Sequence, residues 1–277
     1  MRIYISADME GVTGLVDAED VQPGGRDYEN GRVMMTEDVN AAVRGAMTAG
    51  ATEVTVNDAH GPMRNLLPET LHPAVRLIRG RPKVMGMLEG LDDSYDAVIC
   101  IGFHARAGAH GVMSHSFMGH EIEDMWLDGR PVGEIGLTHA TATALGVPVV
   151  MLSGDDAACA EMTDWDSSVT SVAVKYARDR FAAELRPIGE ARQAIEQAAA
   201  HSLTGRAADA AATAHRTSTL AVRWQSTSVA SALLGITGVT SVDSRTIEAD
   251  GTLPDLYRLF SVWTRVATAL TNQGPYC

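Results

Sequence analysis

The sequence predicts an α/β protein with a mostly parallel sheet that has helices on both faces, followed by a smaller C-terminal α/β domain. Two observations lead to this prediction. Short apolar runs typical of strands alternate along the chain with longer segments of helical spacing, and this alternation is typical of parallel sheets. The chain also has 277 residues, 45% of them hydrophobic, which is enough to fill one large core or two modest ones.

The first half of the chain supplies most of the predicted parallel strands. Residues 97–103 are apolar almost throughout, as expected of a strand that is buried on both faces. Further strands are predicted at residues 3–6, 53–57, 76–78 and 148–152, and helices at about residues 32–49 and 133–145. Residues 125–127 and 130–132 are predicted to form a hairpin, because Asp128-Gly129 between them is typical of a tight primed turn.

The pattern changes in the second half of the chain. A strand at residues 169–174 precedes an Ala-rich helical region at 176–203, broken near Pro187. Strands are then predicted at residues 219–224 and 240–247, with an apolar segment at 229–234 between them. A final helix is indicated by apolar residues at helical spacing, namely Leu256, Leu259, Phe260, Trp263, Val266, Ala267 and Leu270. We therefore expect two domains, residues 1–170 and residues 171–277, the second with a supporting role.

Composition excludes several classes of function. A net charge of -13 and a pI of about 5.0 argue against nucleic acid or an anionic membrane surface as a partner, because both require clustered basic residues. Cationic or zwitterionic small substrates fit this charge better. No apolar run approaches the roughly 20 residues that span a membrane, so we expect a cytoplasmic protein. Cys100, Cys159 and Cys277 have no C-x-x-C spacing, so neither a disulfide framework nor a thiolate zinc site is indicated, and Cys100 is expected in the core.

Two carboxylates follow the first predicted strand directly. Asp8 and Glu10 are two residues apart, and side chains two apart on an extended chain point the same way. Two carboxylates held together cost free energy unless a cation or a proton lies between them. The alternative is that Asp8 caps a helix and Glu10 is solvated, and this stretch alone does not decide between the two.

Two histidines occupy the equivalent position on other strands. His60 follows the strand predicted at 53–57, and His104 follows the strand at 97–103. Because ligands collect beyond the carboxyl ends of parallel strands, these side chains are expected to meet Asp8 and Glu10 at one edge of the sheet. Two carboxylates and two imidazoles form a mixed oxygen and nitrogen set that suits zinc better than manganese or iron. The sequence therefore predicts a metal site in the first domain.

Five motifs together resemble the D-aminopeptidase family of binuclear zinc peptidases. They are Ser6-Ala7-Asp8-Met9-Glu10-Gly11, Val56-Asn57-Asp58-Ala59-His60, Gly102-Phe103-His104-Ala105-Arg106, Gly111-Val112-Met113-Ser114-His115-Ser116 and Arg130-Pro131-Val132-Gly133-Glu134. The resemblance covers most of the first 175 residues in the same order and is weaker toward Cys277.

The resemblance implies an aminopeptidase with two zinc ions per subunit. It implies that Asp8 bridges the ions, that Glu10 adds to one of them, and that His60, His104 and Glu134 complete the other. His115 matches the family's proposed catalytic residue. The resemblance further implies short peptide substrates with an N-terminal D-residue, and a homo-oligomer, a decameric ring built from dimers. Zinc ions sharing one carboxylate would lower the pKa of a bridging water and polarise the scissile carbonyl, which is the chemistry of peptide or amide hydrolysis.

Several residues leave alternatives open. Residues 117–125 depart from the family pattern, so Glu121 or Glu123 could replace Glu134 as a ligand. The Asp155-Asp156 pair follows a predicted strand, where a helix cap is more common than a third metal site. Lys175 could meet a substrate carboxylate but is expected on the surface. The remaining histidines are expected in loops or in structural or solvated positions, namely His72, His110, His120, His139, His201 and His215.

Two other functions compete with the aminopeptidase. One is a different metal-dependent hydrolase, such as an amidase or phosphoesterase, although the chain lacks Gly-rich phosphate-binding loops. The other is a metal-binding scaffold without turnover, which would need the ligands but not His115.

Overall fold

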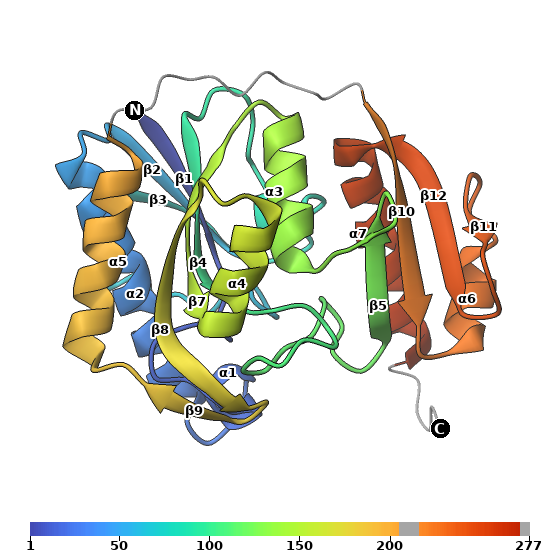
Figure 1. Ribbon diagram of the computed structural model, residues 1–277, viewed down its shortest axis with the longest axis horizontal. Coiled ribbons are helices and arrows are strands. Elements are labelled where there is room, and N and C mark those ends of the chain that lie inside the picture. Colours follow the sequence, from blue (N-terminus) through green and yellow to red (C-terminus); the bar gives the residue numbers. More distant parts are fainter. Residues whose placement is uncertain (205–215, 272–277) are drawn as a thin grey trace.

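A computed structural model describes residues 1–204 and 216–271, and within them the chain forms two sheets (Figure 1). Sheet A has seven strands in the order β3-β2-β1-β4-β7-β8-β9. Sheet B has five strands in the order β11-β12-β10-β5-β6. His215 and Cys277 lie outside the described residues.

Sheet A is parallel from β3 to β8, and only β9, at its edge, runs antiparallel. Its strands are β1 (Arg2–Ala7), β2 (Glu53–Asp58), β3 (Val75–Ile78), β4 (Ala97–Phe103), β7 (Val149–Asp155), β8 (Thr170–Asp179) and β9 (Ala182–Leu185). The predicted mostly parallel sheet is thereby confirmed, and β1 lies at its centre between β2 and β4. The carboxyl ends of these three strands consequently meet at one edge.

Helices cover both faces of sheet A, as predicted (Figure 1). They are α2 (Tyr28–Thr48) and α5 (Ile188–Ser202) on one face, and α3 (Glu134–Ala144) and α4 (Asp156–Trp165) on the other. The strands carry apolar side chains on both faces of the sheet. Ile3 and Ile5 of β1 pack into the core under α2 and α5, whereas Tyr4 packs into the core on the opposite face. The short α1 (Ala18–Val21) and a 3₁₀ turn (Gly86–Leu88) complete this part of the chain.

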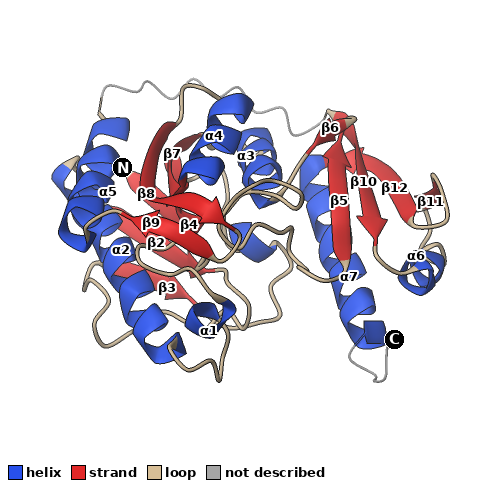
Figure 2. Cartoon of the chain, turned by 60° about the horizontal axis from the view of Figure 1, so that its bottom comes forward, coloured by secondary structure: helices blue, strands red, loops and turns tan. Residues whose placement is uncertain are grey.

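Sheet B is antiparallel and packs with α7 at one end of the molecule (Figure 2). Its strands are β5 (Ile122–Leu127), β6 (Arg130–Pro131), β10 (Thr217–Trp224), β11 (Thr240–Ser241) and β12 (Thr246–Thr252), and its helices are α6 (Thr227–Leu233) and α7 (Leu253–Thr271). The predicted hairpin at Asp128-Gly129 is β5–β6, with Asp128 and Gly129 both at positive φ.

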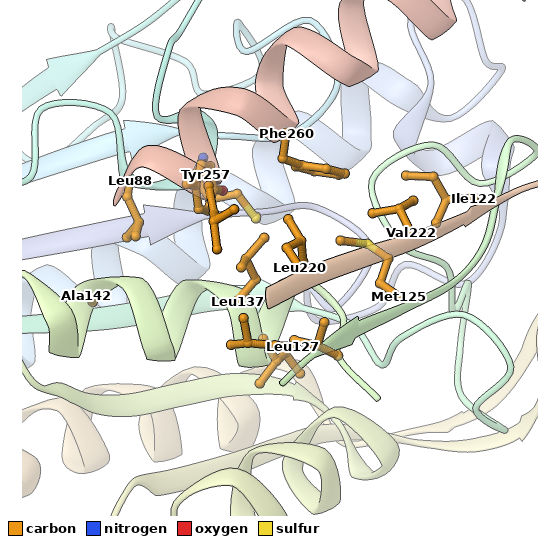
Figure 3. Close-up of a cluster of buried hydrophobic side chains, with 14 of the residues drawn as sticks. Leu88, Ile122, Met125, Leu127, Leu137, Ala142, Leu220, Val222, Tyr257 and Phe260 are labelled. Atoms are coloured by element: carbon orange, nitrogen blue, oxygen red, sulfur yellow. Dashed lines mark hydrogen bonds between the residues drawn. The ribbon is translucent and has the colours of Figure 1, made fainter. Parts of the chain in front are cut away.

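The two sheets share one apolar core. Leu137 of α3, Met125 of β5, Leu220 of β10 and Phe260 of α7 point into it, and all four are buried (Figure 3). This core fixes sheet B and α7 against the α3 face of sheet A.

The division of the chain between the two sheets does not fall at residue 170. Strand β8 begins at Thr170 and belongs to sheet A, which α5 covers. Strands β5 and β6 precede residue 170 but belong to sheet B. The region 176–185, predicted to be helical, is instead the end of β8 and the whole of β9. The prediction was wrong there because intrinsic helix propensity is a weak preference, and the antiparallel pairing of β9 with the end of β8, a strand already paired with β7, outweighs it. The segment 240–247, predicted as one strand, is split between β11 and the start of β12.

Burial confirms the expectation for one cysteine. Cys100 is fully buried in the core of β4. Among the described residues, no helix has both the length and the apolar character that crossing a membrane requires.

Candidate metal centre

The chain beyond β1 is held tightly against the end of β4. The Asp8 amide donates to the Ile101 carbonyl at 2.8 Å, and the Gly11 amide donates to Gly102 at 2.7 Å. A Cβ at Gly11 would lie 1.9 Å from the Phe103 carbonyl oxygen, so only glycine allows this approach. Backbone contacts of this kind fix the positions of Asp8 and Glu10, which bracket the turn.

Three carboxylates converge at this edge of sheet A. Asp8, Glu10 and Glu134 are 3%, 6% and 6% exposed, so none of them has free access to water. Glu134 is the first residue of α3, where the helix dipole favours a negative charge, and its Oε1 accepts a hydrogen bond from the Phe117 amide at 2.7 Å. A buried group of three carboxylates requires compensating positive charge.

Two histidines face the two oxygens of Asp8 separately. Nδ1 of His60 lies 3.4 Å from Asp8 Oδ1 and 3.0 Å from Glu10 Oε2. Nε2 of His104 lies 3.5 Å from Asp8 Oδ2 and 3.3 Å from Glu134 Oε1. The resemblance implied that His60 joins His104 and Glu134. The structure instead places His60 beside Glu10, on the other side of Asp8.

Each histidine at the centre is oriented by a main-chain carbonyl. Nε2 of His60 lies 2.9 Å from the Val21 oxygen, and Nδ1 of His104 lies 3.0 Å from the Ala105 oxygen. Because a carbonyl only accepts, the ring nitrogen facing it must carry the proton. In the neutral ring the other nitrogen then presents its lone pair to the carboxylates. This tautomer, fixed by an outer hydrogen bond, is the usual arrangement of metal-binding histidines.

The residues present fit a zinc-class ion. Asp8 Oδ2 and His104 Nε2 are buried and have no hydrogen-bond partner in the described structure, although they face each other. Ligand atoms of a tetrahedral zinc ion with bonds of about 2.1 Å lie about 3.4 Å apart, close to the spacings observed here. Possible ligand atoms also cluster in two groups, Asp8 with Glu10 and His104, and His104 with His115 and Glu134.

The pKa shifts also indicate that the three buried carboxylates need a compensating positive charge. Burial, with the neighbouring Glu10 carboxylate, raises the pKa of Asp8 to about 7. Burial is the largest effect on His104 and lowers its pKa, but the carboxylates of Glu134, Asp8 and Glu10 together outweigh it and raise that pKa to about 10. Burial likewise opposes ionisation of Glu10, yet His60 together with the other two histidines outweighs it and holds the pKa of Glu10 well below its usual range. Without a metal, the histidines would have to carry the compensating protons.

His115 lies at the same centre but differs from the other two histidines. Its ring stacks on His104 with the centroids 4.1 Å apart and the planes 8° apart. Nδ1 lies 2.8 Å from the Met113 oxygen, and Nε2 lies 3.9 Å from Glu134 Oε1. Burial and the nearby His104 lower the pKa of His115, which favours the neutral form of its ring. His115 therefore offers an unprotonated Nε2 to a cavity of about 1040 Å³ that Asp8, Glu10 and His60 also line.

The sequence profile of the D-aminopeptidase family matches residues 1–262. The chain belongs to the D-aminopeptidase family. A D-aminopeptidase of Bacillus subtilis (strain 168) is 44% identical over 200 residues, which are 72% of this chain and 73% of that protein. The solved structure described as the Zn-dependent D-aminopeptidase DppA from Bacillus subtilis, a self-compartmentalizing protease, is similar over 100% of both chains, with a TM-score of 0.92 and 34% identity.

Glu123, Asp155 and His139 have partners away from the centre. Glu123 is on sheet B, where it pairs with Arg223 and Arg245, so it does not reach the centre. Asp155 caps α4 by accepting from the Ala158 amide at 2.8 Å, as expected for a helix cap. His139 pairs with Asp166 outside the centre.

Lys175 was missed as a residue of this D-aminopeptidase site. It was expected on the surface, but it is fully buried inside sheet A. Its Nζ donates to the carbonyl oxygens of Glu10, Val12 and Leu15 at 2.6, 3.0 and 2.5 Å. Lys175 thus holds the turn that carries Glu10. Its position at the end of a strand was the available signal, but only the fold shows that the side chain points inward.

Proposed function

We propose that this chain is a zinc-dependent aminopeptidase that removes an N-terminal D-residue from short peptides. The observation that carries the proposal is the pair of buried histidines whose free nitrogens face the two oxygens of Asp8, with Glu10 and Glu134 beside them. Membership of the D-aminopeptidase family, and the zinc dependence stated for the solved relative, support the metal and the handedness of the substrate.

Asp8 is proposed to bridge two ions. Glu10 and His60 would complete one site, and His104 and Glu134 the other, following the division that the distances favour. When bound, zinc lowers the pKa of water and polarises a carbonyl as a Lewis acid.

The chain's own residues supply the proton transfer. His115 has a neutral ring, held by Met113, and its Nε2 faces the cavity. In this position it can accept a proton from water while the water oxygen attacks the scissile carbonyl, and can then give that proton to the amine nitrogen as the C–N bond breaks, as a general base and then a general acid. The buried carboxylates beside it can bind the free amino group of the substrate. The stack on His104 keeps the His115 ring in this orientation.

The experiment is a substrate screen on metal-reconstituted protein. The full chain is stripped with a chelator, reloaded with zinc, and assayed with matched D- and L-alanyl p-nitroanilides and with short peptides. We expect turnover of D-substrates, loss of activity in the stripped protein and recovery on reloading. Turnover of an amide without a free amine would favour a general amidohydrolase. Full zinc loading with no turnover of any substrate would favour a metal-binding scaffold.

We further propose that the enzyme works as a homo-oligomer in the form of a decameric ring. The solved relative is described as a self-compartmentalizing protease. Exposed apolar side chains at the β8–β9 hairpin, Tyr176, Phe181 and Leu185, provide material for an interface. Light scattering coupled to gel filtration should return a mass several times 29.4 kDa. A monomer at micromolar concentration would contradict this proposal but leave the catalytic proposal intact.

A further inference from the structure

The cavity that contains the metal centre also contains an unusual group of cations. Arg81, Lys83, Arg180 and Arg265 line it together with Asp8, Glu10 and Glu134. The chain has 35 acidic residues against 22 basic ones, so carboxylates are abundant. Yet in the part of the chain that the structure describes, none of these four cations forms an ion pair. Outside the cavity, most of the described arginines pair with a carboxylate, among them Arg2, Arg44, Arg130 and Arg223, whereas Arg64, Arg79 and Arg186 do not.

Three of the four cations are exposed, namely Arg81, Arg180 and Arg265, and two of them, Arg81 and Arg265, lie on the same wall of the cavity. Lys83 is 5% exposed, and its Nζ is already bound by Asn57 Oδ1 at 2.6 Å and by the Asp58 carbonyl at 2.5 Å. Arg265 is exposed and donates one hydrogen bond, from NH2 to the Lys83 carbonyl at 2.8 Å. Arg81, two residues before Lys83, is also exposed. The bond to Lys83 brings the segment of Arg81 and the helix of Arg265 together.

Helix α7 relates these arginines to the metal centre. The Phe117 amide binds Glu134, and the Phe117 ring packs on Phe260 with centroids 4.7 Å apart. Phe260, together with Tyr257, whose ring also packs on Phe117 with centroids 6.4 Å apart, therefore lies on the part of α7 that faces the centre. Arg265 is five residues beyond Phe260 and eight beyond Tyr257, rises of about 7.5 Å and about 12 Å along the helix. An extended peptide advances about 3.3–3.6 Å per residue, so these rises correspond to about two to four residues of substrate.

We propose that Arg81 and Arg265 bind the C-terminal carboxylate of a short peptide whose N-terminal residue lies at the metal centre. This inference rests on the proposed aminopeptidase function and adds what the substrate must carry at its other end. Guanidinium groups suit the planar, two-oxygen geometry of a carboxylate. A carboxylate would also neutralise cations that the chain itself leaves unpaired. The enzyme then selects short peptides with a free C terminus over amidated ones.

The test compares an acid with its amide. The zinc-loaded full chain is assayed with D-alanyl-D-alanyl-D-alanine and with the same tripeptide amidated at its C terminus, by release of the N-terminal residue. We expect the wild type to prefer the acid by about 10-fold or more in kcat/KM, mainly through KM, because the arginines lie away from the reacting bond. Arg265→Gln and Arg81→Gln should each reduce this preference, and the double variant should abolish it. The preference should fall in each case because kcat/KM for the acid falls.

A matched control is available two residues from Arg81. Arg79 is exposed and does not line the cavity, so Arg79→Gln should keep the full preference for the acid. The same acid and amide are also compared by calorimetry as analogues in which the scissile amide is reduced to a methylene-amine. Calorimetry measures the affinity for the carboxylate even if no peptide is hydrolysed. A lack of hydrolysis would refute the catalytic proposal but would leave this inference to be judged by affinity. Equal affinity and turnover for acid and amide in the wild type, or an unchanged preference in the double variant, would overturn the inference.

Discussion

The two sheets differ in how they use polar residues. At the carboxyl edge of sheet A, the residues that follow β1, β2 and β4 include Asp8, Glu10, His60 and His104, all less than a tenth exposed. Sheet B carries comparable residues, including Glu123 and Asp243, but these pair with arginines near its surface. Parallel strands deliver their ends to one edge, whereas antiparallel strands send alternate ends to opposite edges. The comparison shows that the topology of sheet A, rather than the residue types, concentrates charge in a buried site.

Removing the shared ligand should break sheet A's site most severely. Asp8→Asn takes away the charge that both proposed ions share, so we expect both to be lost and activity to fall to background. Elemental analysis of the purified variant measures this directly. The control is Asp93→Asn, an exposed carboxylate far from the centre in the same part of the chain, which should retain both ions. Full metal content in the Asp8 variant would contradict the bridging role.

The next largest effect is expected at His115. His115→Ala removes the proposed proton-transfer group but no proposed ligand, so turnover should fall by about 10² to 10⁴ while the metal content stays unchanged. Single-turnover kinetics and elemental analysis on the same preparation separate the two quantities. His120→Ala provides the matched control, because His120 is exposed and lines the same cavity. If the His115 variant lost metal instead, the residue would be a ligand.

A Lys175 variant tests whether the hydrogen bonds from its Nζ hold the turn after β1 in place. Lys175→Met keeps the volume but leaves the carbonyls of Glu10, Val12 and Leu15 without this donor. We expect a loss of about 3 kcal/mol in the free energy of unfolding, from buried acceptors left unpaired, together with weaker binding of the ion proposed at Glu10. Denaturant titration with and without zinc checks both effects. An unchanged midpoint would show that the turn holds its own conformation.

The smallest effect is expected on sheet B. Glu123→Gln breaks pairs with Arg223 and Arg245, but the Glu123 side chain is 38% exposed, so stability should change by less than about 1 kcal/mol. Metal content and activity should be unaffected. The matched change at the edge of sheet A, Glu134→Gln, should remove the ion proposed at His104. Equal metal loss in the two variants would erase the difference between the sheets on which this comparison depends.

The sequence by itself determined the local features of this protein. The apolar runs and the polar residues directly after them are properties of neighbouring positions, and they predicted the parallel sheet and the meeting of Asp8, Glu10, His60 and His104 at its edge. The hairpin at Asp128-Gly129 followed for the same reason, since a tight turn depends on the conformation of two residues.

The tertiary structure alone decided features that depend on distant partners. Residues 176–185 form the β8–β9 hairpin at the end of a strand whose first part, residues 170–175, is paired with β7, and no local pattern contains that pairing. Sheet B combines β5 with β10, about ninety residues later, so the division at residue 170 does not follow the sheets. The burial of Lys175, the placement of His60 beside Glu10, and the hydrogen bond from Arg265 to the segment of Arg81 and Lys83 likewise arise from packing between separate segments. Spacing along a chain fixes which way a side chain leaves its own strand or helix, but only the folded chain fixes what it meets.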